Sequence, residues 1–238
     1  MTAAAASAGR IGPNAITRVA EVLPALLGEG GTRALFDAAG LGAYLSTPPE
    51  GMVDETEVAQ LHRVLRQQLG PQVAGQVARS AGMRTADYLL ARRIPQPVQW
   101  LLKRLPATLA ARVLLQAIGR HAWTFAGSGQ FHAVAGRPCV LTIHDNPLCR
   151  GVASDQPACD FYSATFERLF QVLVHPAVQA VALGLVARLE DDPRRRAGLH
   201  ADAQALLAAG LVLGCFNAWH WVDKEGREIR KQEADDDD

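Results

Sequence analysis

Residues 158–170 read Ala158-Cys-Asp-Phe-Tyr-Ser-Ala-Thr-Phe-Glu-Arg-Leu-Phe170, and this segment organises the second half of the chain. The run continues to Val174, and its apolar residues recur at helical spacing. They are Tyr162, Phe166, Leu169, Phe170 and Leu173. The spacing predicts a helix over residues 160–174 that buries one face.

Short segments rich in β-branched and aromatic residues precede this helix. They cover residues 123–125, 130–134 and 139–144, with Gly127-Ser-Gly129 and Gly136-Arg-Pro138 between them. This alternation predicts short strands joined by hairpin turns. After Pro176, residues 178–186 are expected to form a further strand.

The first half of the chain predicts one helix after another. Asn14 can cap a helix that reaches Leu27, and Pro24 inside it should produce a kink. Asp54 with Glu57 resembles a capping box. Further helical runs cover residues 73–93, 98–105 and 109–121, separated by the prolines around Ile94-Pro95-Gln96-Pro97 and by Pro106. The sequence therefore predicts a helical N-terminal half.

The composition gives little information about binding partners or cellular compartment. Lys plus Arg and Asp plus Glu both total 24, so nothing points to a nucleic-acid partner. The four cysteines form no CxxC pair, and Met1 to Gly9 lack the charge pattern of a signal peptide, so a cytoplasmic setting is expected. The final four aspartates are expected to be disordered.

Residues 203–222 carry no charge. Their length is close to the roughly 20 residues of a membrane span, but polar residues interrupt the run. We expect a buried amphipathic helix here. The alternatives are a helix lying on the membrane surface, which would make the protein peripheral at the inner membrane, and a membrane span.

The familiar catalytic motifs are missing. The sequence has no GxGxxG loop, no P-loop and no GxSxG elbow. Gly127-Ser-Gly129 supplies only the first two glycines of a nucleotide-binding loop, and it lies between predicted strands. We interpret it as a hairpin turn.

Histidine and aromatic side chains are the candidate ligand-binding groups. His132 and His144 lie in the predicted strands, and either could donate a nitrogen to a metal centre or simply bond to backbone. Aromatic residues cluster in the same region and could line a pocket for a flat apolar ligand or form ordinary core. The candidates are Trp123, Phe125, Phe131, Tyr162 and Phe166.

Residues 120–175 resemble the 4-vinyl-reductase domain of bacteriochlorophyll biosynthesis proteins. The resemblance rests on the cysteine-led helix Ala158–Phe170, the Phe125–Phe131 turn and the Ile143–Pro147 loop. The helical half, including Asp87–Pro95, is similar to the N-terminal region of the bacteriochlorophyll members. In total the resemblance spans roughly residues 10 to 185.

This resemblance implies an α+β fold: a helical N-terminal half, then a small antiparallel sheet packed against helices. We therefore expect a helical region (1–119), a ligand-binding domain (120–190), and a divergent C-terminal helix with a disordered acidic tail (191–238).

The resemblance also implies a reaction. The bacteriochlorophyll members are assigned to reduction of the 4-vinyl group of divinyl protochlorophyllide, with NADPH or ferredoxin as conceivable donors. The expected ligand is a magnesium tetrapyrrole, either divinyl protochlorophyllide or magnesium protoporphyrin, to which His132 or His144 could give an axial nitrogen. Because no donor site is visible, the alternative is a non-catalytic carrier or assembly factor. It would deliver the precursor to other bacteriochlorophyll biosynthesis enzymes. A sensor module is a third interpretation.

Some relatives of the domain hold zinc through a cysteine at the start of this helix, a glutamate and two later cysteines. Cys159 matches the first position, which makes it the metal-ligand candidate. No cysteine follows it before Cys215. The sequence therefore disfavours zinc.

Overall fold

The computed structural model describes residues 9–136, 139–150, 152, 158–184, 210–216, 221–222 and 228–229. Its helices are α1 (Asn14–Ala38), α2 (Ala43–Ser46), α3 (Glu55–Arg92), α4 (Gln96–Leu102), α5 (Ala107–Arg120), α6 (Trp123–Ala126) and α7 (Asp160–Leu173), with a 3-10 turn at Pro147–Cys149. Its strands are β1 (Arg10–Ile11), β2 (Val53–Asp54), β3 (Gln130–Val134), β4 (Cys139–His144), β5 (Gln179–Gly184), β6 (Gly210–Phe216), β7 (Trp221–Val222) and β8 (Glu228–Ile229).

The helical first half is confirmed, with three corrections. Asn14 does not cap α1, because the N-cap position is Pro13 and no side chain caps this helix. The break in α1 falls at Gly28, which has φ 67°, and not at Pro24. Glycine adopts a positive φ without steric cost, so the helix bends at this residue. The predicted helices beginning at Asp54 and at Val73 form one element, α3, bent at Gly70 just before Pro71.

Helix α3 connects the two halves of the molecule because α1 and α7 both pack against it. At the crossing with α7, a Cβ on Gly82 would lie 2.2 Å from the carbonyl oxygen of Phe161, so only glycine permits this approach. Thr165 Oγ1 donates to the Gly82 carbonyl at 3.1 Å. The predicted apolar stripe of α7 is buried, as expected from its spacing. The helical half and the sheet region therefore share one core.

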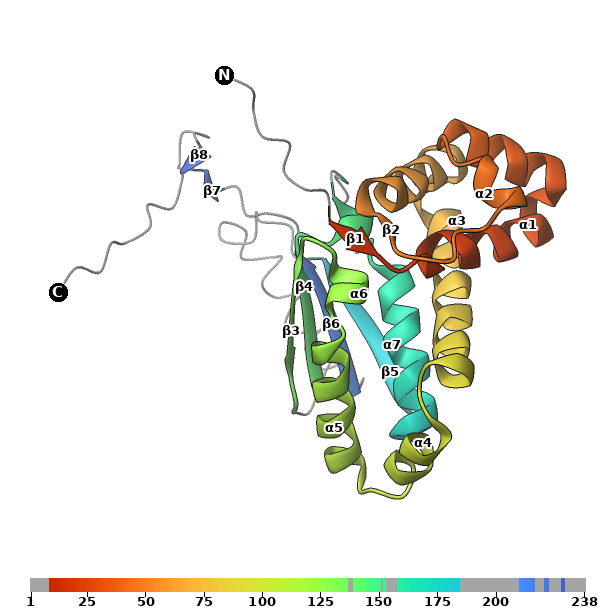
Figure 1. Ribbon diagram of the computed structural model, residues 1–238. Coiled ribbons are helices and arrows are strands. Elements are labelled where there is room, and N and C mark those ends of the chain that lie inside the picture. Colours follow the sequence, from red (N-terminus) through yellow and green to blue (C-terminus); the bar gives the residue numbers. More distant parts are fainter. Residues whose placement is uncertain are drawn as a thin grey trace.

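The main sheet has four strands in the order β3-β4-β6-β5. The predicted hairpin is confirmed: β3 and β4 are antiparallel, with His132 opposite Thr142. Strand β6 lies between β4 and β5 and runs parallel to both. Helices α5 and α7 lie on the same side of this sheet (Figure 1). The α+β class with a small sheet packed against helices is confirmed, and the parallel β6 pairings make the sheet mixed.

Two predicted elements are wrong. Residues 123–125 are not a strand but part of α6, in which Thr124 N–H donates to the His121 carbonyl and Ala126 N–H to the Ala122 carbonyl. These local bonds outweigh the β preference of the aromatic residues. Residues 210–216 are strand β6 and not part of a helix. A central strand can consist of a continuous run of apolar residues. Periodicity alone does not distinguish such a run from a buried helix.

The predicted strand at residues 178–186 is confirmed as β5 over Gln179–Gly184. The expected disorder of the last four aspartates lies outside the described residues. Among the helices that the structure describes, none has both the length and the apolar character needed to cross a membrane.

Candidate functional site

Four of the predicted aromatic residues form one cluster on the helix-covered face of the sheet. Phe125 of α6 packs edge-on against Phe131 of β3, with ring centroids 5.3 Å apart, and against Phe166 of α7 at 5.6 Å. Tyr162 and Phe166 lie one helical turn apart and stack at 6.3 Å. The Tyr162 hydroxyl donates to the Phe125 carbonyl at 2.7 Å. The cluster fastens α6 and β3 onto α7. Trp123, by contrast, is 63% exposed on α6.

An open groove of about 500 Å³ runs between α5 and β3. It is lined by Arg112, Val113, Leu115, Gln116 and Gly119 of α5 and by Phe131, His132, Ala133 and Ala135 from β3 and the residue beyond it. Its volume falls in the range typical of small-molecule sites. Phe131 joins the groove to the aromatic cluster behind it. The groove therefore offers an apolar wall and one guanidinium, and the edge-strand residue His132 borders it.

His132 and His144 come together on the sheet face opposite the aromatic cluster. Along β3 and β4 burial alternates, so Phe131 and Ile143 point inward while His132 and His144 point outward. Their ring centroids are 5.6 Å apart. Only His132 of this pair lines the groove, because β3 is the edge strand beside α5.

Cys159 is buried at the position preceding α7, and its carbonyl accepts the Ser163 hydroxyl at 3.0 Å. The Cys149 thiol donates to the Ala158 carbonyl at 3.3 Å. Within the described residues, no three His, Cys, Asp or Glu side chains lie close enough together to hold a metal ion. Cys159 thus has no ligand set around it in that part of the chain.

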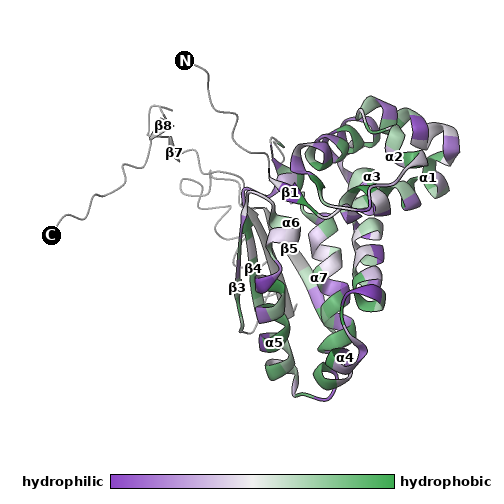
Figure 2. Cartoon of the chain, viewed as in Figure 1, coloured by the Kyte–Doolittle hydropathy of each residue, from purple (hydrophilic) through white to green (hydrophobic). Residues whose placement is uncertain are grey.

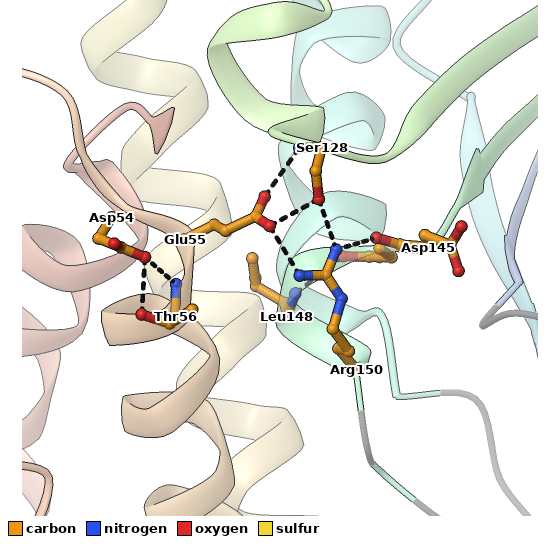
Figure 3. A network of polar contacts seen from close by, with 8 residues as sticks. Asp54, Glu55, Thr56, Ser128, Asp145, Leu148 and Arg150 are labelled. Carbon is orange, nitrogen blue, oxygen red and sulfur yellow. Dashed lines mark hydrogen bonds and ion pairs between the residues drawn. The ribbon is translucent and has the colours of Figure 1, made fainter. Parts of the chain in front are cut away.

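A buried carboxylate that no sequence motif singles out joins three segments (Figure 3). Glu55, in the first turn of α3, accepts bonds from Ser128 N–H at 2.8 Å and the Ser128 hydroxyl at 2.6 Å. Arg150 donates to the same carboxylate at 2.7 Å. Arg150 also donates to the Asp145 carbonyl at 3.0 Å, so the loop after β4 is held as well.

The electrostatics of Glu55 follow from these contacts. Burial alone would raise its pKa, but the hydrogen bonds from Arg150 and Ser128 outweigh burial and leave the pKa below its ordinary value. The carboxylate is therefore ionised at neutral pH. The neighbouring Asp54 caps α3 as predicted, accepting from Thr56 N–H at 2.7 Å. Glu57 does not complete a capping box, since it accepts the Tyr44 hydroxyl at 2.9 Å.

The Gly127-Ser-Gly129 segment is a turn, as interpreted, but it joins α6 to β3 and not two strands. Its backbone does not fit a nucleotide phosphate. The Ser128 N–H that would face an anion is already bonded to the Glu55 carboxylate. A second negative charge at this point would be repelled.

The chain is similar to two known proteins. Over 178 residues, it is 48% identical to the bacteriochlorophyll synthase 23 kDa chain of Cereibacter sphaeroides. The aligned region covers 75% of this chain and 85% of that protein. Over 169 residues, it is 41% identical to the bacteriochlorophyll synthase 23 kDa chain of Rhodobacter capsulatus, covering 71% of this chain and 78% of the other. The chain belongs to this family.

Membership of the bacteriochlorophyll synthase 23 kDa chain family agrees with the pathway that the resemblance implied. Neither relative's name mentions a reductase. The comparisons therefore show the family but not the 4-vinyl reduction. No family profile matches the chain. No solved structure matches it either.

Sequence reasoning missed three polar residues of this region. Glu55 and Arg150 lie 95 positions apart, and no local pattern links them. Arg112 stands on the exposed side of α5, where an arginine is ordinarily just a solvated charge. Only the packing of α5 beside the edge strand makes it a groove residue.

Proposed function

We propose that this protein takes part in bacteriochlorophyll biosynthesis by binding a magnesium tetrapyrrole precursor in the α5–β3 groove. The observation that carries the proposal is the groove itself, which combines an apolar wall with Arg112 and is bordered by His132 at the sheet edge. A flat macrocycle can lie against Phe131 and the alanines of β3. Arg112 can pair with a carboxylate of the ligand. The names of the relatives support the pathway.

Reduction of the 4-vinyl group of divinyl protochlorophyllide is the finer form of this proposal. It rests on the resemblance of the Ala158–Phe170 helix to the 4-vinyl-reductase domain. The chain's own residues would hold and orient the ring, while NADPH or ferredoxin would supply the electrons. The one glycine turn that could be compared with a nucleotide loop is occupied by Glu55, so we assign no donor site.

A non-catalytic carrier or assembly factor is the second candidate. The open groove at the sheet edge favours it, because a ligand held there stays accessible to another enzyme of the pathway. The two candidates share the ligand and the groove. They differ only in whether the bound precursor is converted.

A single preparation tests both candidates. The purified protein is titrated with divinyl protochlorophyllide and the absorption spectrum followed, first alone and then with NADPH or reduced ferredoxin. Conversion of the substrate supports the reductase, and a spectral shift without conversion under either donor supports the carrier. A spectrum identical to that of free pigment contradicts both.

Arg112→Gln locates the site. Loss of a charge-assisted pair should weaken binding about tenfold, since roughly 1.4 kcal/mol corresponds to that factor. Arg120→Gln is the matched control, because Arg120 is an exposed cation at the end of the same helix and does not line the groove. If the two variants bind the tetrapyrrole with equal affinity, the ligand binds outside the groove.

A further inference from the structure

The end of the molecule formed by α4, the following turn and the start of α5 exposes large apolar side chains. Trp100 is 57% exposed, Leu101 50% and Leu109 44%, and Val98 and Val113 are exposed as well. We call this surface, from Val98 to Val113, the α4–α5 tip. In Figure 1 the tip lies at the opposite end of the molecule from α1.

These side chains are held outward by the way α4 is anchored. The buried amide of Gln99 donates to the Leu90 carbonyl at 2.6 Å and to the Ile94 carbonyl at 2.8 Å. Leu102 is buried on the same face of the short helix. With Gln99 and Leu102 turned inward, Trp100 and Leu101 must face solvent. Their exposure is therefore part of the folded structure.

The tip also carries an unbalanced positive charge. Between Asp87 and Asp145 the sequence contains no Asp or Glu but has Arg92, Arg93, Lys103, Arg104, Arg112, Arg120 and Arg137. Lys103, Arg104 and Arg112 belong to the tip and are exposed, and Arg92 and Arg93 are exposed at the end of α3 that precedes it. The Arg104 guanidinium stacks over the Trp100 ring at 3.7 Å. Since the whole chain has zero formal charge, this end is a local cationic excess.

Figure 2 shows hydrophobic and hydrophilic residues side by side along α4 and α5. Interleaved cations and apolar residues with an exposed tryptophan are typical of proteins that bind the interface of an anionic membrane. A nucleic acid would use the cations but give no reason for exposed leucines. The core of a protein interface is ordinarily depleted of charged residues other than arginine, whereas here Lys103 also lies among the exposed apolar groups.

We propose that the α4–α5 tip docks on the surface of an anionic lipid bilayer. Trp100, Leu101 and Leu109 enter the boundary between headgroups and acyl chains, and Lys103 and Arg104 bind lipid phosphates. The proposal concerns a different part of the chain from the uncharged run at residues 203–222. Arg112 and Val113 belong both to the tip and to the groove, so docking brings one end of the groove next to the bilayer.

Co-sedimentation with vesicles tests the proposal without any pigment, so its failure leaves tetrapyrrole binding untouched. The protein should sediment with vesicles of phosphatidylcholine mixed with phosphatidylglycerol and remain in solution with phosphatidylcholine alone. Raised salt should release it. Lys103→Gln with Arg104→Gln should weaken binding about fivefold for each cation removed. Trp100→Ser with Leu101→Ser should abolish it.

The matched control is Leu26→Ser with Arg33→Gln on α1, which also removes one exposed apolar side chain and one exposed cation. This variant should bind like the wild type. Brominated lipid should quench the fluorescence of the wild type and of Trp123→Phe, but much less that of Trp100→Phe. Absence of vesicle binding, or equal binding by the tip and control variants, overturns the proposal. So does binding of a protein partner at the tip in the absence of vesicle binding.

Discussion

Arg150 donates a hydrogen bond of 2.7 Å to Glu55, a carboxylate that is only 3% exposed and lies 95 residues earlier in the chain. Through this pair and Ser128, the first turn of α3 holds the turn before β3 and the loop after β4. The start of β3 and the end of β4, which pair at the open end of the hairpin, are therefore both tied to the helical half. The pair aligns the edge strand that forms one wall of the groove.

Glu55→Gln should lower the free energy of unfolding by about 2 kcal/mol. Removing one partner of a buried ion pair typically costs more, but Arg150 is partly exposed and water will solvate its freed guanidinium. Urea denaturation followed by circular dichroism measures the change. Glu50→Gln, at an exposed carboxylate, is the control and should have little effect. Equal unfolding midpoints for the two variants would mean that the network contributes nothing to stability.

Gly127→Ala should destabilise the protein by about 2 kcal/mol or more. Gly127 has φ 60°, and a Cβ there would lie 2.1 Å from Glu55 Oε2, so both the backbone and the network resist a side chain. Gly30→Ala is the control. A Cβ at Gly30 meets nothing within 4 Å, and alanine favours the helix. In thermal denaturation, the melting temperature of Gly127→Ala should be lower than that of the wild type. The melting temperature of Gly30→Ala should be unchanged or higher.

His62 should make the stability of the protein depend on pH below about 6.5. Burial lowers the pKa of His62 to about 3, with a smaller contribution from Arg66, and its Nε2 lies 3.2 Å from the Ala15 carbonyl. The unfolded chain therefore takes up the proton first. Stability is full above the unfolded pKa and falls as pH drops from there toward 3, by at most about 1.4 kcal/mol per pH unit.

Urea unfolding at pH 7 and pH 5 measures this dependence. His62→Gln lowers stability at both pH values because it disturbs the core, but the difference between them should shrink. His121→Gln changes an exposed histidine and should retain the wild-type difference. If the unfolding midpoint of His62→Gln shifts between pH 7 and pH 5 as much as that of the wild type, the pH dependence arises from other groups.

His132→Ala should weaken or remove the Soret-band shift on tetrapyrrole binding, since His132 lines the groove. His144→Ala should have the smaller effect, because its ring is 5.6 Å from that of His132 but does not line the groove. Absorption titration of both variants measures the difference. If neither changes the band, axial ligation by these histidines is wrong.

The sequence by itself determined the elements whose signal is local. The 3.6-residue spacing from Tyr162 to Leu173 predicts α7 and its buried face, and the glycine turns and β-branched residues predict the β3–β4 hairpin. Asp54 identifies the start of α3. Strand parity places His132 on the opposite face from Phe131. Each of these depends on residues a few positions apart, whose side chains have a fixed relationship in a helix or strand.

Only the tertiary structure decided what depends on distant partners. Strand β6 lies parallel between β4 and β5, and a run of apolar residues does not say which partners it will have. Glu55 became a buried link because Ser128 and Arg150 meet it in space. Arg112 became a groove residue because α5 packs beside an edge strand. Such contacts arise when elements dock, and docking is settled by the burial of the whole core and not by any local pattern.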